Sequence, residues 1–238
     1  MSIDIVLIST MNRLDLLEQT ITSMAQHGTD DSHSLTLVLD NPESFPYARG
    51  SQSPGMNIVI TSSQAGASRA RNIGASSIPK YRRQKYVMFC DDDLYFCPRW
   101  DAKMLELSTQ VPNAIISGHA HPFNHAELVY EPHRVENGGI HYSVPLVVST
   151  PHFMMPWELW DDVGYFVEPG GPGGSEDYDY CQRAGKKGYG FAVSEPQCVI
   201  HTGLTSSSGK PIVGAEQVRE NNAKLEIIHG IERKVIYV

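Results

Sequence analysis

This chain of 238 residues lacks the features of several common protein classes. It has no uninterrupted apolar run long enough to cross a bilayer, and its first residues are not a basic segment followed by an apolar stretch. No segment repeats, and none is of low complexity. We therefore expect a soluble protein with no transmembrane segment and no secretory leader.

Cysteine is scarce, and an excess of positive charge is absent. The four cysteines form no CxxC pair and have no zinc-ligand spacing, so reduced thiols in a cytoplasmic protein are the simplest explanation. The formal charge of -8 argues against nonspecific nucleic-acid binding, and the basic run at residues 80–83 is best explained as a solvated helix end. With 41% hydrophobic residues, the chain is expected to form one domain, 1–238.

The order of apolar patterns in the first half predicts an α/β fold. A nearly continuous aliphatic run at 3–8 is typical of a strand buried on both faces, and apolar residues at helical spacing follow at 12–24. The alternation continues with strands at 34–39, 57–60 and 86–90 and a helix at 68–76. This pattern predicts a Rossmann-like, mostly parallel sheet flanked by helices, with a ligand crevice at the carboxyl ends of the strands.

The second half has a less regular pattern. Helices are predicted at 98–107 and 156–163, with extended segments at 114–117, 144–149, 190–193 and 198–201. We expect a nucleotide-binding half at 1–97, a mixed acceptor and catalytic half at 98–204, and a C-terminal helix and strand in 205–238.

Three carboxylates, Asp91, Asp92 and Asp93, follow a short apolar run directly. Their mutual repulsion costs stability unless water or a cation relieves it, and Mg²⁺ and Mn²⁺ prefer oxygen ligands. A solvated turn after an edge strand is the alternative, and the triplet alone does not decide between the two. Thr10 and Asp40 also follow predicted strands, so three loops are expected to converge on one crevice.

An acidic pair and a histidine lie far downstream of the triplet. Glu176 and Asp177 follow a glycine-rich loop and begin a predicted helix with Ser175 as its N-cap. Acids in a first turn are also favoured by the helix dipole without any catalytic duty. His201 ends a predicted strand, and a lone histidine is more often structural than a ligand. Together these groups could form a divalent-metal site with a general base beside it.

Two weaker candidates have a structural and a functional explanation each. His119 and His121 would face the same way on a strand and could together bind a metal. The residues that follow them favour a loop instead. Four aromatic residues could stack on a sugar or another ring acceptor, although their helical spacing favours core packing. These are Trp157, Trp160, Tyr165 and Phe166.

Taken together, six blocks resemble family 2 glycosyltransferases of the GT-A fold, in the family's order. They are IVLISTMNR (5–13), ASRARNIG (67–74), FCDDD (89–93), VGYF (163–166), SEDYD (175–179) and VIH (199–201). Each block alone is a weak signal, whereas six in order with plausible spacing are specific. The resemblance spans roughly residues 3–203.

The resemblance implies an inverting transfer of a sugar from a nucleotide diphosphate sugar to an acceptor hydroxyl, with Mn²⁺ or Mg²⁺ as cofactor. Asp177 matches the general base, and Glu176 is its neighbour on the acceptor side. The nucleotide-sugar site would comprise Thr10, Asn12, Arg13, Asp40, Arg71, Asp91 and Asp92. The metal site would comprise Asp93, His201 and Asp91.

The chain departs from the family at two places. Asp40 is followed by Asn41 and Pro42 instead of a second acid, which leaves the nucleobase open among UDP-, GDP- and dTDP-sugars. The Gln-x-x-Arg-Trp segment of processive members is absent, since no tryptophan follows Trp160. We therefore expect nonprocessive transfer of single sugars.

The acceptor and two other functions stay open at this point. A glycan, a small molecule, a protein or a modified base are all possible acceptors. A noncatalytic nucleotide-sugar-binding module is one alternative to the transferase. A metal-dependent nucleotidyl or phosphoryl-transfer enzyme that uses the same carboxylates is the other.

Overall fold

The computed structural model describes residues 1–9, 13–40, 56–63, 65–121, 133–137, 140–144, 148, 151–168 and 176–202. The strands are β1 (Ile3–Ser9), β2 (Ser34–Leu39), β3 (Met56–Ile60), β4 (Tyr86–Asp91), β5 (Leu94–Phe96), β6 (Ala114–His121), β7 (His133–Asn137), β8 (Ile140–Val144), β9 (His152–Pro156) and β10 (Gly190–His201). The helices are α1 (Leu14–His27), α3 (Ala67–Ser76), the short 3-10 helix η2 (Lys80–Arg82), α4 (Trp100–Gln110), α5 (Trp157–Val163) and α6 (Glu176–Lys186).

The first four long strands form the parallel half of the sheet that the sequence predicts. The described strands are ordered β3-β2-β1-β4-β9-β6-β10-β8-β7, and β5 pairs with β10. β1 pairs in parallel with both β2 and β4, and β2 pairs in parallel with β3. The carboxyl ends of these strands therefore share one edge, as the predicted crevice requires.

The second half of the sheet is mixed. β9 runs antiparallel to both β4 and β6, whereas β10 runs parallel to β6. β5, β7, β8 and β9 were not predicted, because β5 has only three residues and β7 is largely polar. The extended segment predicted at 144–149 lies mostly outside the described residues, as do the helix and strand predicted in 205–238.

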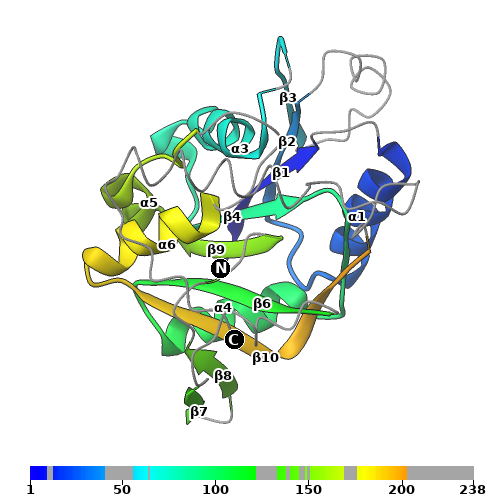
Figure 1. The fold of residues 1–238 in the computed structure, drawn as a ribbon. Helices are drawn as coiled ribbons and strands as arrows, with labels where there is room; N and C mark the ends of the chain where they lie inside the picture. The colour runs from blue at the N-terminus through cyan, green and yellow to red at the C-terminus, as the bar shows by residue number, and fades with distance from the viewer. Residues whose placement is uncertain are drawn as a thin grey trace, which may run out of the picture.

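Helices cover both faces of the sheet (Figure 1). One core cluster joins α1 and α4 to the strands through side chains such as Leu17, Leu37 and Trp100. The other joins α3, α5 and α6 to the opposite face through Ala70, Phe89 and further aromatic residues. The strand ends are thus held by a core on each side, which fixes the polar groups that follow them.

A buried carboxylate ties α4 to the turn between α1 and β2. The side chain of Asp101 is fully buried and accepts hydrogen bonds from the Thr29 amide (2.7 Å), the Asp30 amide (3.1 Å) and the His33 ring (3.1 Å). His33 accepts the Ile3 amide at Nδ1, so its Nε2 carries the proton toward Asp101. Although burial opposes it, these hydrogen bonds hold the pKa of Asp101 below its ordinary value.

We predict that Asp101→Asn destabilises the protein by about 1–3 kcal/mol at pH 7, because buried donors lose a charged acceptor. A lowered pKa stabilises the fold above the ordinary value of about 3.9 and ceases to do so as pH falls through the folded pKa. The difference from wild type should therefore narrow below about pH 4. Urea unfolding at pH 7 and below about pH 4 measures this difference in stability. The control is Asp31→Asn, which changes an exposed acid of the same turn. Equal losses in the two variants would contradict this role.

Candidate active site

The acidic triplet lies where the two central parallel strands end. Asp91 is the last residue of β4 and pairs in register with Ile8 of β1. Ser9, the last residue of β1, donates from Oγ to Asp92 Oδ2 at 2.6 Å. Asp92 is buried, so its carboxylate does not belong to a solvated turn. The burial of Asp92 and Asp93 argues against the solvated turn, and the metal site stays a prediction.

Arg13 and His201 bring two positive groups to this cluster. The Arg13 guanidinium donates to Asp92, and to Asp93 Oδ2 at 2.8 Å. His201 ends β10, where it pairs in register with Leu94, and its Nε2 lies 2.9 Å from Asp93 Oδ1. Both oxygens of Asp93 are therefore engaged, by groups that come from opposite ends of the described chain.

Arg71 joins the triplet to the downstream acidic pair. Its side chain is 1% exposed, and its two terminal nitrogens donate to Asp91 Oδ1 and to Glu176 Oε1, each at 2.7 Å. α3 thereby connects β4 to the first turn of α6. The family resemblance places Arg71 in the nucleotide-sugar site; in the structure its guanidinium bridges two protein carboxylates.

Glu176 and Asp177 are adjacent in sequence but differ in surroundings. Glu176 is buried and paired with Arg71. Asp177 is partly exposed, and its Oδ1 accepts the Tyr178 amide at 2.7 Å. Because a general base must reach a proton on the substrate, Asp177 is the better placed of the two.

Of the predicted site residues that remain, Asp40 is the one that the structure describes, and it is not part of this cluster. Asp40 is buried, and its carboxylate accepts hydrogen bonds from Thr61 Oγ1 (2.8 Å) and from the amides of Ala65 and Gly66 (2.8 and 2.7 Å). Both of its oxygens hold the turn before α3. Thr10 and Asn12 lie outside the described residues, so their predicted contacts with the nucleotide stay predictions.

Burial and the hydrogen bonds of the cluster shift its pKa values in different directions. Burial raises the pKa of Asp92 to about 7, although Arg13 and Ser9 oppose it, and burial likewise raises the pKa of Asp91 to about 6. Burial opposes ionisation at Asp93 and His201 too, but their hydrogen bond lowers the pKa of Asp93 and raises that of His201. The mutual attraction of these two groups favours an ion pair.

Asp93 and His201 suit a divalent cation as a two-residue ligand set. No group of three His, Cys, Asp or Glu side chains with metal-binding geometry occurs among the described residues, and the side chains of His119 and His121 are not described. Mg²⁺ is typically held by one or two carboxylates together with substrate phosphates, and Mn²⁺ also accepts oxygen ligands. A carboxylate next to an imidazole fits that chemistry if diphosphate oxygens complete the shell. His201 would have to be neutral to bind.

Sequence reasoning missed several residues that support the site. Thr20 Oγ1 of α1 bonds the carbonyls of Asp92 and Leu94, at 2.9 and 2.8 Å. Asn72 makes a reciprocal pair of hydrogen bonds with the main chain of Phe166, each 2.9 Å long. Ser9 could have been found from its place at a strand end, but Thr20 could not, because a threonine within a helix carries no such signal.

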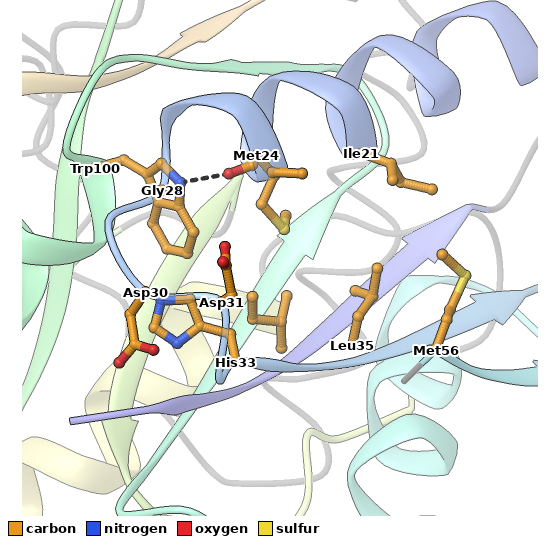
Figure 2. A pocket seen from close by; sticks show the side chains of 11 residues that line it. Ile21, Met24, Gly28, Asp30, Asp31, His33, Leu35, Met56 and Trp100 are labelled. Atoms are coloured by element: carbon orange, nitrogen blue, oxygen red, sulfur yellow. Dashed lines mark hydrogen bonds between the residues drawn. The ribbon is translucent and has the colours of Figure 1, made fainter. Parts of the chain in front are cut away.

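A separate pocket lies at the other edge of the parallel sheet (Figure 2). It has a volume of about 320 Å³ and is lined mainly by apolar groups of α1 and of the first residues of β2 and β3. Leu35, Met56 and Met24 face it, and Trp100 closes one side by donating from its indole nitrogen to the Met24 carbonyl at 3.0 Å. It contains no predicted site residue, and ligands of such sheets bind at the opposite strand ends.

The comparisons with known proteins give the family and the fold of the chain. A family model described as glycosyl transferase family 2 matches residues 5–163, so the chain belongs to that family. The matched residues include Arg13, Arg71 and the triplet but end before Asp177 and His201. Comparison with curated proteins gives no significant match. None of the described helices has both the length and the apolar character that a membrane span requires.

Two solved structures have similar folds. One is the crystal structure of GalNAc-T7 with UDP, GalNAc and Mn²⁺, with a TM-score of 0.72 and 12% identity, covering 95% of this chain and 48% of that one. The other is S. aureus TarS, with a TM-score of 0.63 and 14% identity, covering 96% of this chain and 40% of that one. The predicted GT-A fold is confirmed. The chain spans less than half the length of either protein.

We predict that Arg71→Met destabilises the fold by about 3–5 kcal/mol, because Asp91 and Glu176 would be left without their shared cation. Arg71→Lys should fall between this variant and wild type, since an ammonium lacks the planar fork that serves two carboxylates. Denaturant unfolding measures both. Arg69→Met, on the exposed side of the same helix, should change stability by only about 0.5 kcal/mol. A loss at Arg71 no larger than this control would contradict the bridging role.

Proposed function

We propose that the protein transfers one sugar at a time from a nucleotide diphosphate sugar to an acceptor hydroxyl, with inversion at the anomeric carbon. The observation that carries this proposal is the Arg71 bridge between Asp91 and Glu176. It brings a donor-side group of carboxylates next to a partly exposed carboxylate, Asp177, that could serve the acceptor. These are the two chemical functions that glycosyl transfer requires.

The donor would bind at the triplet with its diphosphate toward Asp93 and His201. When bound there, Mn²⁺ or Mg²⁺ would offset the negative charge that the leaving diphosphate gains. Arg13, whose side chain is 17% exposed, is placed to contact donor oxygens while it remains near Asp92 and Asp93. Asp93 and His201 as metal ligands are part of the proposal, whereas the nucleobase is left open among UDP-, GDP- and dTDP-sugars.

The acceptor would bind on the side of α6. As the bond from the anomeric carbon to the diphosphate breaks, the acceptor oxygen forms a bond to that carbon, and Asp177 takes the proton of its hydroxyl. A single displacement from the face opposite the leaving group inverts the anomeric configuration. Glu176, held by Arg71, would fix the start of α6 and thereby the position of Asp177.

The comparisons support this proposal at the level of reaction class. Membership of the family favours nucleotide-sugar chemistry, and UDP, GalNAc and Mn²⁺ are present in the GalNAc-T7 structure. We extend the same kind of donor and metal to this chain. A cytoplasmic location and nonprocessive transfer remain the expectations from sequence.

Two alternatives are separated by the products. Incubation with UDP-, GDP- and dTDP-sugars and Mn²⁺, followed by chromatography of the nucleotides, should yield the nucleoside diphosphate if the sugar moves. The nucleoside monophosphate would instead indicate cleavage of the pyrophosphate by a nucleotidyl or phosphoryl-transfer enzyme. Donor binding without any product would indicate a binding module. A thermal-shift screen identifies the bound donor first, because a ligand that binds only the folded state stabilises it.

We predict that Asp177→Asn retains donor binding but lowers transfer by about 10²–10⁴-fold, because the amide cannot accept the acceptor proton. Asp93→Ala should instead remove metal-dependent donor binding, since it deletes a carboxylate ligand of the proposed site. Calorimetric titration of the donor with and without Mn²⁺, together with initial transfer rates, measures both.

The control is Asp162→Asn, an exposed acid on α5 that pairs with Lys187 away from the cluster. It should leave binding and transfer unchanged. If Asp177→Asn and Asp93→Ala lost donor binding equally, the division between base and donor groups would be wrong.

A further inference from the structure

α3 has an outward face as well as the inward face that carries Arg71. Arg69, Asn72, Ile73 and Ser76 recur at intervals of three and four residues and so lie on one side of the helix. With residues of the turn after α5 they line a groove of about 660 Å³. That volume lies within the roughly 300–1,000 Å³ of small-molecule sites.

Tyr165 is the unusual residue of this groove. Tyr165 is 59% exposed, whereas its aromatic neighbours Trp160 and Phe166 are 3% and 2% exposed. The ring packs edge to face with Trp160, with 5.8 Å between centroids, and Ser76 donates to its hydroxyl at 3.3 Å. Three of the four aromatic residues in the predicted stacking group are therefore core residues, and Tyr165 alone reaches solvent.

The main chain around Tyr165 is held on both sides. Arg183 donates to the carbonyls of Val163 (3.0 Å) and Tyr165 (2.9 Å), and is itself fixed by Asp179 at 2.9 Å. On the other side, Asn72 bonds both the amide and the carbonyl of Phe166. An exposed ring on a fixed backbone loses little freedom when it binds a partner.

The groove contains both hydrogen-bond donors and hydrogen-bond acceptors. Arg69 is exposed and has no ion pair with any other described residue, and Glu168 offers a carboxylate of which Oε1 accepts from Asn72 at 2.9 Å. Donors and acceptors around an exposed aromatic ring suit a neutral pyranose, whose C–H face packs on the ring while its hydroxyls bond both kinds of group. The carboxylate disfavours an anionic ligand.

We propose that this groove binds a sugar unit of a glycan acceptor, at a distance from the hydroxyl that reacts. The inference rests on the proposed function and narrows its acceptor to an oligosaccharide. The groove shares α3 with the site: Asn72 lines the groove, and Arg71, the residue before it, holds Glu176.

The test compares Tyr165→Ala with wild type on a printed glycan array and then in solution with the oligosaccharides that bind. The ring should be worth roughly threefold to tenfold in affinity, by analogy with aromatic stacking. Tyr165→Phe should bind as wild type does, because it keeps the ring. Donor hydrolysis by water should be the same in all three proteins, since the contacts of Tyr165 are with Ser76, Arg183 and Trp160 and not with the triplet.

Tyr81→Ala is the matched control, because Tyr81 is an 83% exposed tyrosine on η2 and outside the groove. It should leave oligosaccharide binding unchanged. The proposal is overturned if no glycan binds wild type, or if Tyr165→Ala binds glycans as tightly as wild type does. Cleavage of the donor without glycan binding would overturn the groove and leave the transferase intact. Glycan binding that depends on Tyr165, without any cleavage of the donor, would support the groove and overturn the transferase.

Discussion

The site depends on one buried guanidinium with two carboxylate partners. Removing a charged group from water costs several kcal/mol, and only close partners with good geometry offset that cost. Arg71 has such partners in Asp91 and Glu176, and each of them would in turn be costly to bury alone. β4, α3 and α6 must therefore be in place together, so the proposed donor and acceptor sides would form as one unit.

The other two cations of the cluster are held less deeply. The side chains of Arg13 and His201 are 17% and 15% exposed, against 1% for Arg71. All three neutralise carboxylates that would otherwise repel one another. Because Arg13 and His201 lie nearer to solvent, we expect them to exchange partners when a donor arrives, while Arg71 keeps its two. The triplet thus has partners within the protein, and a divalent cation bound at Asp93 would replace some of them.

The sequence predicted most of the parallel half because its strands are long aliphatic runs, as at 3–8 and 34–39. It failed for β5 and β7, which are short or polar and are fixed by pairing with neighbours. Within the site, position at a strand end grouped Asp91 to Asp93 with Thr10 and Asp40. The carboxylate of Asp40 holds a turn, whereas Asp93 contacts His201, which ends another predicted strand. Strand topology gives the location of a side chain but not the partners that it takes.

Two neighbouring acids at the start of α6 differ in their surroundings. Glu176 is buried together with Asp179 and Tyr180, and its carboxylate accepts a hydrogen bond from Arg71. Asp177 is partly exposed, although Cys181 and Ala184, which follow it by four and seven residues on the same side of the helix, are buried. Its place in the first turn, and not the side of the helix on which it lies, therefore distinguishes it from these residues. The base that we propose is thus the acid that is not committed to Arg71, a distinction that the adjacent letters of the sequence do not contain.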